Sequence, residues 1–298
     1  MARQPPEGEP LLVSKQFYYI TYKASKQAKN GIGPGLTPLV KVLIIGKERQ
    51  KRIVKMGYRK KIYKTGPVIE IGKTYYIPHK RVREMKAKAT AEAVKKNNDK
   101  LALRELTRQI TTYFAKGDLF LALTYRRGER PDPETAKKQM KKFWRGMQKA
   151  YAEERRELYY ISTTAYGSRG GIHHHAIVNY IDIRKIQALW PYGMVIPKLT
   201  YMDSVFSALA AYILQQNKQS PGEKMEGIKG RRWSHSRNIK RVEPKIEEVD
   251  AKEWAKKPRA LKGYRIITES VEDGINPVTG IPYQFYRMIK VEKSRKER

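Results

Sequence analysis

Residues 159–180 decide the fold. They read Tyr159-Tyr-Ile-Ser-Thr-Thr-Ala-Tyr166, then Gly167-Ser-Arg-Gly-Gly171, then Ile172-His-His-His-Ala-Ile-Val-Asn-Tyr180. The first segment is rich in β-branched and aromatic residues, which favour strands, and the last segment runs from its histidines into an apolar stretch. The glycine-rich segment between them supplies a turn. This pattern predicts a β-hairpin with strands at 159–166 and 173–180.

Strand and helix signals alternate on both sides of this hairpin. The apolar run from Leu119 to Tyr125 predicts a buried strand. The sequence Asp132-Pro-Glu134 predicts a helix start, because Asp caps, Pro fits the first position and Glu suits the positive helix end. That helix is expected to bury one stripe, made of Ala136, Met140, Phe143, Trp144, Met147 and Tyr151. After the hairpin we expect a helix at 183–190, a strand at 194–201 and a helix at 204–218. The order predicts an α+β fold with a mainly antiparallel central sheet and flanking helices.

The charge of the chain points to a polyanionic partner. The 298 residues hold 63 Lys and Arg against 29 Asp and Glu, a formal charge of +34, which repels itself in a folded protein. Nucleic acid, ribosomal RNA and an anionic membrane surface all satisfy it. The chain has no Cys, so disulfides, thiolate zinc sites and cysteine nucleophiles are excluded. We expect an intracellular, cytoplasmic protein, because the N-terminal segment has no apolar signal region and no apolar run is long enough to span a bilayer.

Charge and punctuation divide the chain into three zones. Residues 1–117 hold 27 Lys and Arg against 8 Asp and Glu, a net +19, and predict a basic N-terminal region that contacts DNA, with a helix over 82–115. Residues 118–220 contain the predicted α+β domain. Residues 221–298 are rich in Pro, Gly and dispersed charge, which predicts an irregular basic extension packed on or near the core.

Basic segments with interspersed aromatic residues are the predicted DNA contacts, because cations bind phosphates and aromatic rings stack on bases. One segment has nine Lys and Arg between Lys47 and Lys64, and another reads Arg231-Arg-Trp-Ser-His-Ser-Arg-Asn238. The alternative for both is an ordinary solvated face or a packed loop. The predicted contacts are Lys51, Arg52, Arg59, Lys60, Lys61, Arg169, Arg231, Arg232, Trp233 and Arg237.

The three consecutive histidines and one tyrosine are the candidates for chemistry. Side chains alternate across a strand, so His173 and His175 share one face, where two imidazoles can ligate one divalent ion, and His174 takes the other. Tyr212 lies beside the expected apolar stripe of the last helix, with Gln215 and Gln216 one turn later. A phenolate can attack phosphorus to form a phosphotyrosine, and a bound metal can polarise the phosphate. Taken alone, a Tyr beside an apolar stripe is usually the edge of a core. The expected stripe is Val205, Phe206, Leu209 and Ile213.

These segments resemble plasmid or phage rolling-circle replication initiators of the HUH endonuclease superfamily, over roughly residues 110–290. Residues 119–125 resemble the first family motif, Ile172-His-His-His-Ala-Ile-Val178 the His-hydrophobic-His motif, and Ala211-Tyr-Ile-Leu-Gln-Gln216 the tyrosine motif. Residues 231–238, 274–280 and 283–287 resemble the Firmicutes-type branch. The resemblance implies a split βαβ core, His173 and His175 as metal ligands, Tyr212 as nucleophile, and a metal-dependent nick of one strand at an origin. That nick leaves a 5′-phosphotyrosine link and a 3′-hydroxyl that primes synthesis.

Two positions depart from the family pattern. Ala165 stands where a Glu is expected as third metal ligand, and Gln215 stands where a Lys is expected; Lys218 is the nearest replacement but lies elsewhere around the helix. Loss of the carboxylate favours Mn²⁺ over the harder Mg²⁺. The expected substrate is single-stranded or hairpin origin DNA, with host helicase and polymerase as partners, since no helicase phosphate loop is present, and with no membrane or small-molecule substrate. A catalytically degenerate DNA-binding relative remains the main alternative. An RNA-binding or ribosome-associated protein is the third and has no account of the His triplet.

Overall fold

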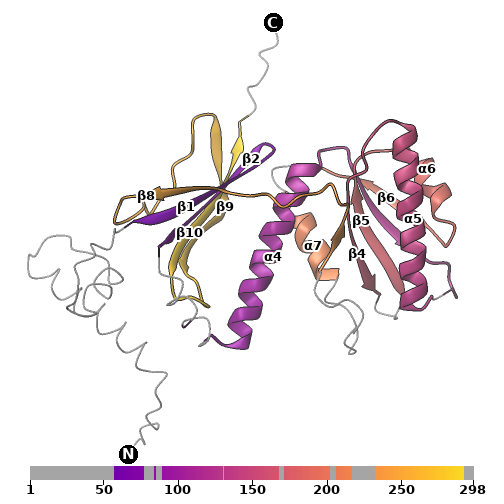
Figure 1. Cartoon of the computed structure of the whole chain (residues 1–298), viewed down its shortest axis with the longest axis horizontal. Helices are drawn as coiled ribbons and strands as arrows, with labels where there is room; N and C mark the ends of the chain where they lie inside the picture. Colours follow the sequence, from indigo (N-terminus) through magenta and orange to yellow (C-terminus); the bar gives the residue numbers. More distant parts are fainter. Residues whose placement is uncertain are drawn as a thin grey trace, which may run out of the picture.

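Two five-stranded antiparallel sheets lie on either side of one long helix, α4 (Ala91–Tyr113), in the computed structural model of the chain (Figure 1). The structure describes residues 57–76, 84, 89–129, 131–167, 171–201, 206–216 and 232–291. Within these residues, no helix is both long enough and apolar enough to cross a membrane. The antiparallel sheets and the helices that cover them confirm the predicted α+β fold class.

The first sheet comes from the middle of the chain and has the strand order β6-β3-β5-β4-β7. Its strands are β3 (Leu119–Thr124), β4 (Tyr160–Tyr166), β5 (Ile172–Val178), β6 (Val195–Leu199) and the two-residue β7 (Ser234–His235). Helix α5 (Pro133–Glu153) connects β3 to β4, α6 (Ile183–Leu189) connects β5 to β6, and α7 (Ser207–Gln216) follows β6. Without β7, this is the order of the split βαβ, or ferredoxin-like, unit.

Each face of this sheet is covered by a different pair of helices. On one face, α5 and α6 pack against Leu119, Leu121 and Leu123 of β3, because these alternate residues all point to that side. On the other face, α4 and α7 pack against Ile161 of β4 and Ile177 of β5. The predicted α5 stripe is buried except for Trp144, which is half-buried. On α7, Ala210 and Leu214 complete the buried stripe in place of the half-buried Leu209, and Val205 lies outside the described residues.

The end of the connection from α6 to β6 needs a glycine. A Cβ atom at Gly193 would overlap the carbonyl oxygen of Thr124, so no other residue fits beside the end of β3. Pro197 is tolerated in β6 because β6 is an edge strand, where a missing N–H costs no ladder hydrogen bond.

The second sheet combines strands from both ends of the described chain. Its order is β8-β1-β2-β10-β9, with β1 (Tyr58–Thr65), β2 (Val68–Tyr75), β8 (Lys245–Val249), β9 (Tyr264–Ile275) and β10 (Pro282–Lys290). The C-terminal zone was expected to be irregular, and this expectation is wrong for its described part, where three strands pair with each other or with β1 and β2. The zone boundaries at 117 and 220 stay predictions, although this sheet joins the first zone to the last.

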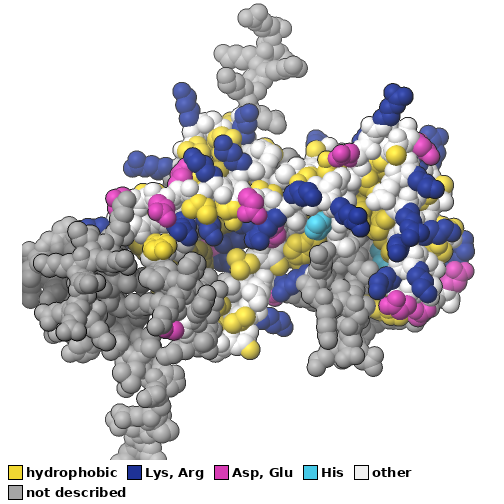
Figure 2. Space-filling view, viewed as in Figure 1, with side chains coloured by type: hydrophobic (Ala, Val, Ile, Leu, Met, Phe, Trp, Pro, Cys, Tyr) yellow, Lys and Arg dark blue, Asp and Glu magenta, His cyan; other side chains and the backbone are white. Residues whose placement is uncertain are grey.

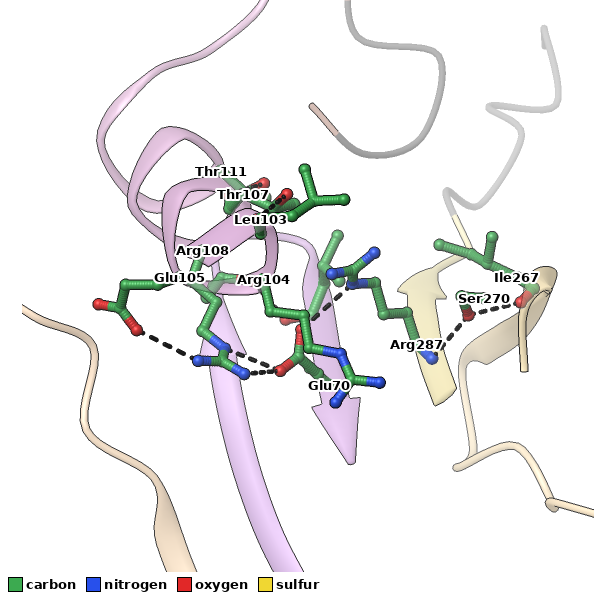
Figure 3. Close-up of polar contacts among 12 residues, drawn as sticks. Glu70, Leu103, Arg104, Glu105, Thr107, Arg108, Thr111, Ile267, Ser270 and Arg287 are labelled. Atoms are coloured by element: carbon green, nitrogen blue, oxygen red, sulfur yellow. Dashed lines mark hydrogen bonds and ion pairs between the residues drawn. The ribbon is translucent and has the colours of Figure 1, made fainter. Parts of the chain in front are cut away.

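Helix α4 holds the two sheets together because its two sides have different chemistry. Thr90 caps its N-terminus by accepting a hydrogen bond from the backbone N–H of Ala93. Leu106 and Ile110 are fully buried toward the middle sheet. On the opposite side, Arg108 binds the carboxylate of Glu70 in β2, and Figure 3 shows Arg287 reaching the same carboxylate from β10. The helix therefore joins one sheet by apolar packing and the other by ion pairs.

Candidate active site on the middle sheet

Strand β5 places His173 and His175 on the α7 side of the sheet. Their ring centroids are 4.9 Å apart, and the two rings are perpendicular. The ring of His175 is stacked parallel to Phe120 of β3 at 5.6 Å. His174 points to the opposite face, as strand alternation requires. The two imidazoles are therefore side by side, with Phe120 fixing the plane of one of them.

His175 is buried, and neither of its ring nitrogens has a hydrogen-bond partner in the described part of the chain. Thr163, its cross-strand neighbour on β4, has a buried hydroxyl that also lacks a partner there. Burial, with a smaller contribution from His173, lowers the pKa of His175 to about 4. The imidazole is therefore neutral at physiological pH, which is the form that binds a metal. Buried polar groups are rarely left unpartnered, so these atoms mark a place for a ligand.

A two-imidazole metal site fits these residues, and a third protein ligand is missing from the described chain. The described residues contain no group of three or more His, Cys, Asp or Glu side chains that could hold an ion. Ala165 is the residue opposite His173 on β4, and it is almost fully buried. An ion held here would take its remaining ligands from water, from substrate oxygens or from the unpartnered hydroxyl of Thr163.

Helix α7 brings Tyr212 to the same face as the histidine pair. The Tyr212 ring lies 5.3 Å from the His175 ring and 5.8 Å from the Phe120 ring, edge-on to both. Ala210 and Ile213 are fully buried and hold α7 against the sheet, whereas Tyr212 is 40% exposed. A tyrosine that is anchored through its helix and still reaches solvent is available to an external substrate. Among the supporting residues, Gln215 is exposed, and the side chain of Gln216 and all of Lys218 lie outside the described part.

His174 has a structural role on the other face of the strand. Its Nε2 lies 3.0 Å from the Tyr125 hydroxyl and its Nδ1 lies 2.9 Å from the Thr164 hydroxyl, so both nitrogens are satisfied. It also packs edge-on against Trp190. Burial, followed by the neighbouring His173 and His175, lowers the pKa of His174 to about 3. This neutral, fully bonded imidazole fixes the strand between the two histidines that face α7.

The predicted DNA contacts do not form one cluster. Arg59 and Lys60 pair with Glu248 and Glu247 of β8, and Lys61 lines a cavity between α4 and the second sheet. Arg232 pairs with Asp99. Lys and Arg side chains are spread over the face drawn in Figure 2, and many of them lie over α5. Of the other predicted contacts, Lys51, Arg52, Arg169 and Arg231 lie outside the described residues.

Trp233 is used for packing. Its indole N–H donates to the side-chain oxygen of Gln109 on α4 at 3.0 Å, and its ring packs against the core between α4 and α7. Arg237, four residues later, is exposed and has no ion-pair partner among the described residues. Of these two residues, Arg237 is the one that is free to meet a phosphate.

The sequence did not identify Thr163 or Phe120 as parts of this site. Thr163 is two residues before Ala165 and so shares its face of β4, and Phe120 shares the corresponding face of β3. Strand alternation places both residues beside the histidine pair, but neither residue type suggests a ligand or a reactive group. The signal was therefore positional and not chemical.

Comparison with known proteins agrees with the part of the chain that builds this site. No curated protein and no solved structure matches the chain. Residues 118–217, from the start of β3 to the end of α7, match the sequence model of a family described as replication-associated protein, of the ORF2 and gene 2 protein type. The match contains both histidines and Tyr212, and it supports a Rep-type replication initiator.

Proposed function

We propose that this protein nicks single-stranded DNA through Tyr212, in the manner of an HUH endonuclease that initiates rolling-circle replication. The phenolic oxygen attacks a backbone phosphorus and loses its proton to solvent. The bond from phosphorus to the 3′ oxygen breaks, and that oxygen leaves as a 3′-hydroxyl after taking up a proton. The 5′ side of the DNA stays on Tyr212 as a phosphotyrosine, and attack by a 3′-hydroxyl reverses the step without an added energy source.

One observation carries this proposal: two buried, unpartnered imidazole nitrogens of His175 lie beside a solvent-exposed tyrosine on one face of the sheet. A purely structural histidine would have its nitrogens bonded, as His174 does on the opposite face. The sheet therefore contains, side by side, a satisfied histidine and one that is kept neutral and open.

His173 and His175 are the residues that would hold a divalent metal, Mn²⁺ or Mg²⁺. Such an ion, when bound, supplies charge that offsets the negative charge developing on the phosphate. The protein's own part is to keep the His175 imidazole neutral by burial, to set its plane by stacking on Phe120, and to hold Tyr212 beside it through the buried side of α7. These features pre-orient the site before DNA arrives.

The substrate class follows from the geometry of the reaction and from the charge. Tyr212 must reach a phosphorus from the side, which an unpaired strand allows more easily than a duplex. We therefore propose single-stranded or hairpin origin DNA as the substrate. The free 3′-hydroxyl would prime a host polymerase, and strand separation would depend on a host helicase.

The test is a covalent-adduct assay on a denaturing gel. The full chain is incubated with labelled single strands from its replicon in Mn²⁺, Mg²⁺ or EDTA. We expect a metal-dependent adduct with the wild type, and none with Tyr212→Phe, whose DNA affinity should stay within about twofold. Tyr201→Phe is the matched control, because Tyr201 is also an exposed tyrosine, at 72%, and lies outside the group of rings around His175. An adduct in Tyr212→Phe would show that another residue is the nucleophile.

A second candidate is a DNA-binding relative with the same fold and no nicking activity. Ala165 favours it, because this residue faces His173 where a carboxylate ligand would have to stand. Gln215 favours it as well, since no cation follows Tyr212 one turn later on α7. Tight, salt-sensitive binding with no adduct in any metal would select this candidate.

A further inference from the structure

A cavity of about 780 Å³ lies on the opposite face of the same sheet, between α5 and the edge formed by β4 and β7. Its floor includes Thr164 and His174, and its wall on the helix side includes Trp144 and Arg145. Gln148 and Tyr160 also line an adjoining hollow of about 540 Å³, which contains Arg237. The two hollows form one continuous groove along α5, which we call the α5 groove.

One wall of the α5 groove carries a straight row of cations. Lys137, Lys141 and Arg145 are spaced four residues apart on α5, so they lie along one side of the helix at intervals of about 6 Å. All three are exposed, and within the described chain Lys141 and Arg145 have no carboxylate partner, while Lys137 has only the exposed Glu134 at 3.6 Å. Figure 2 shows Lys and Arg side chains over α5 with apolar side chains beside them. A regular row of unpaired cations suits a chain of phosphates.

The other wall is aromatic and rich in hydroxyl groups. Trp144 and Tyr160 are stacked face to face at 3.7 Å, with their planes 7° apart. Tyr166 also lines the groove and is half-buried, with no ring partner and no hydrogen bond among the described residues. Ser162 and Ser234 hydrogen-bond to each other through their hydroxyls at 2.8 Å on the same wall. Aromatic faces for stacking and hydroxyls for base edges are the second half of a single-strand binding site.

The groove lies directly behind the candidate active site. His174 is on its floor, between the two histidines that point to the other face. β7 pairs only with Ile161 and Ser162 of β4, so the outer edge of β4 from Thr163 to Tyr166 has no strand partner in the described part of the chain. A strand that leaves Tyr212 can therefore pass around this short open edge to reach the groove.

We propose that the α5 groove binds a segment of single-stranded DNA adjacent to the nicked phosphate, with phosphates along Lys137, Lys141 and Arg145 and a base on Tyr166. The inference rests on the proposed function for the identity of the strand. A duplex would offer only phosphates to the groove, because its bases stay stacked inside, and the aromatic wall would then have no partner. A free nucleotide would use only one position of the cation row.

The test compares two pairs of substitutions on the same helix. Lys141→Ala with Arg145→Ala removes two groove cations, and Lys138→Ala with Lys142→Ala removes two exposed lysines of α5 that do not line the groove. Binding of the full chain to fluorescein-labelled oligothymidylate is measured by anisotropy in EDTA, across a salt series. We expect the groove pair to lower affinity at least about tenfold and to reduce the slope of log K against log salt by about 1.4, at about 0.7 per phosphate. The control pair should change affinity by less than about twofold.

Tyr166→Leu tests the aromatic wall separately. It should lower affinity for oligothymidylate about tenfold, because one stacked base is lost, and leave the salt slope unchanged. Equal losses from the groove pair and the control pair would overturn the proposal, because total charge would then account for binding. Equal losses toward a labelled duplex, or thymidine monophosphate competing as well as the oligonucleotide, would also overturn it.

The same samples separate this proposal from the nicking proposal. Binding in EDTA does not need Tyr212 or a metal, whereas the adduct needs both. Groove variants that bind weakly while the wild type forms no adduct would support the groove and reject the nicking function. An adduct that is unchanged in the groove variants, with unchanged binding, would do the reverse.

Discussion

Ala165 of β4 lies directly opposite His173 of β5 in the antiparallel register, with its methyl group on the same face as the histidine pair. The position is 1% exposed, so its surroundings enclose it. A longer acidic side chain here would point toward His173, since directly opposed residues have neighbouring Cβ atoms. The absence of a carboxylate among the described site residues therefore comes down to one position.

Ala165→Glu is expected to complete the site. Mn²⁺ affinity measured by calorimetry should rise at least about tenfold, because a carboxylate joins the two imidazoles, and binding of the harder Mg²⁺ should become measurable. Without metal, the variant should lose about 2 kcal/mol of unfolding free energy or more, since the new carboxylate is buried without a partner. Saturating Mn²⁺ should restore much of that loss.

Ala165→Gln controls for side-chain size, because it adds similar volume with no charge. It should be destabilised in the presence and absence of metal alike. A gain in affinity that is as large in Ala165→Gln as in Ala165→Glu would mean that position 165 acts by packing and not as a ligand.

Replacing the histidine pair should separate metal binding from folding. His173→Ala with His175→Ala is expected to abolish metal-dependent adduct formation and calorimetric Mn²⁺ binding. His175→Leu alone should leave the metal-free unfolding free energy unchanged or higher, because it removes two buried nitrogens that have no partner in the described chain. His174→Leu is the matched comparison and should be destabilised by about 1–3 kcal/mol, since it leaves the Tyr125 and Thr164 hydroxyls unbonded. Retained Mn²⁺ binding in the double variant would remove the metal assignment.

The middle sheet could be predicted because its information is local. The hairpin strands begin and end within about two residues of the expected positions, and α5 starts at Pro133 behind its Asp132 cap. Each of these elements has a clear apolar period and a turn signal next to it. The second sheet lacks both advantages. β1 pairs with β8 through residues such as Arg59 and Glu248, 189 positions apart, and its α4 side is polar, so the alternation that marks a strand is weak.

The candidate site was predicted in part for a related reason. Alternation alone placed His173 and His175 together, and the order of elements brought Tyr212 to them. The stacking of Phe120 and the open hydroxyl of Thr163 depend on cross-strand register, which a sequence does not fix without its partner strands. The packing of Trp233 depends on α4, whose Gln109 accepts its N–H.

Glu70 is the centre of the interface between α4 and the second sheet. It is 2% exposed and accepts hydrogen bonds from Arg108 at 2.7 Å and from Arg287 at 3.2 Å (Figure 3). Glu70→Gln keeps the shape but leaves two largely buried cations without their counter-ion. We expect a loss of about 3–5 kcal/mol of unfolding free energy, measured by urea denaturation. Glu105→Gln is the control, because Glu105 also pairs with Arg108 but from a partly exposed position, and it should cost less than half as much. Similar losses in both would indicate that the burial of Glu70 adds nothing.

Glu272 gives the same interface a dependence on pH. Burial acts to raise its pKa, but the hydrogen bonds and charges of Lys100 and Arg104 outweigh this and hold the pKa below its usual range. A carboxyl group with a lowered pKa in the folded state stabilises the fold above its ordinary pKa, and this stabilisation is lost as the pH falls through the lowered value. Glu272→Gln should therefore be less stable than the wild type at about pH 7, and the difference should shrink as both are titrated toward about pH 3. Glu269→Gln, at an exposed position on the same strand, should show no such difference at either pH. A gap between wild type and Glu272→Gln that stays constant across this range would mean that the side chain acts through shape and not through its charge.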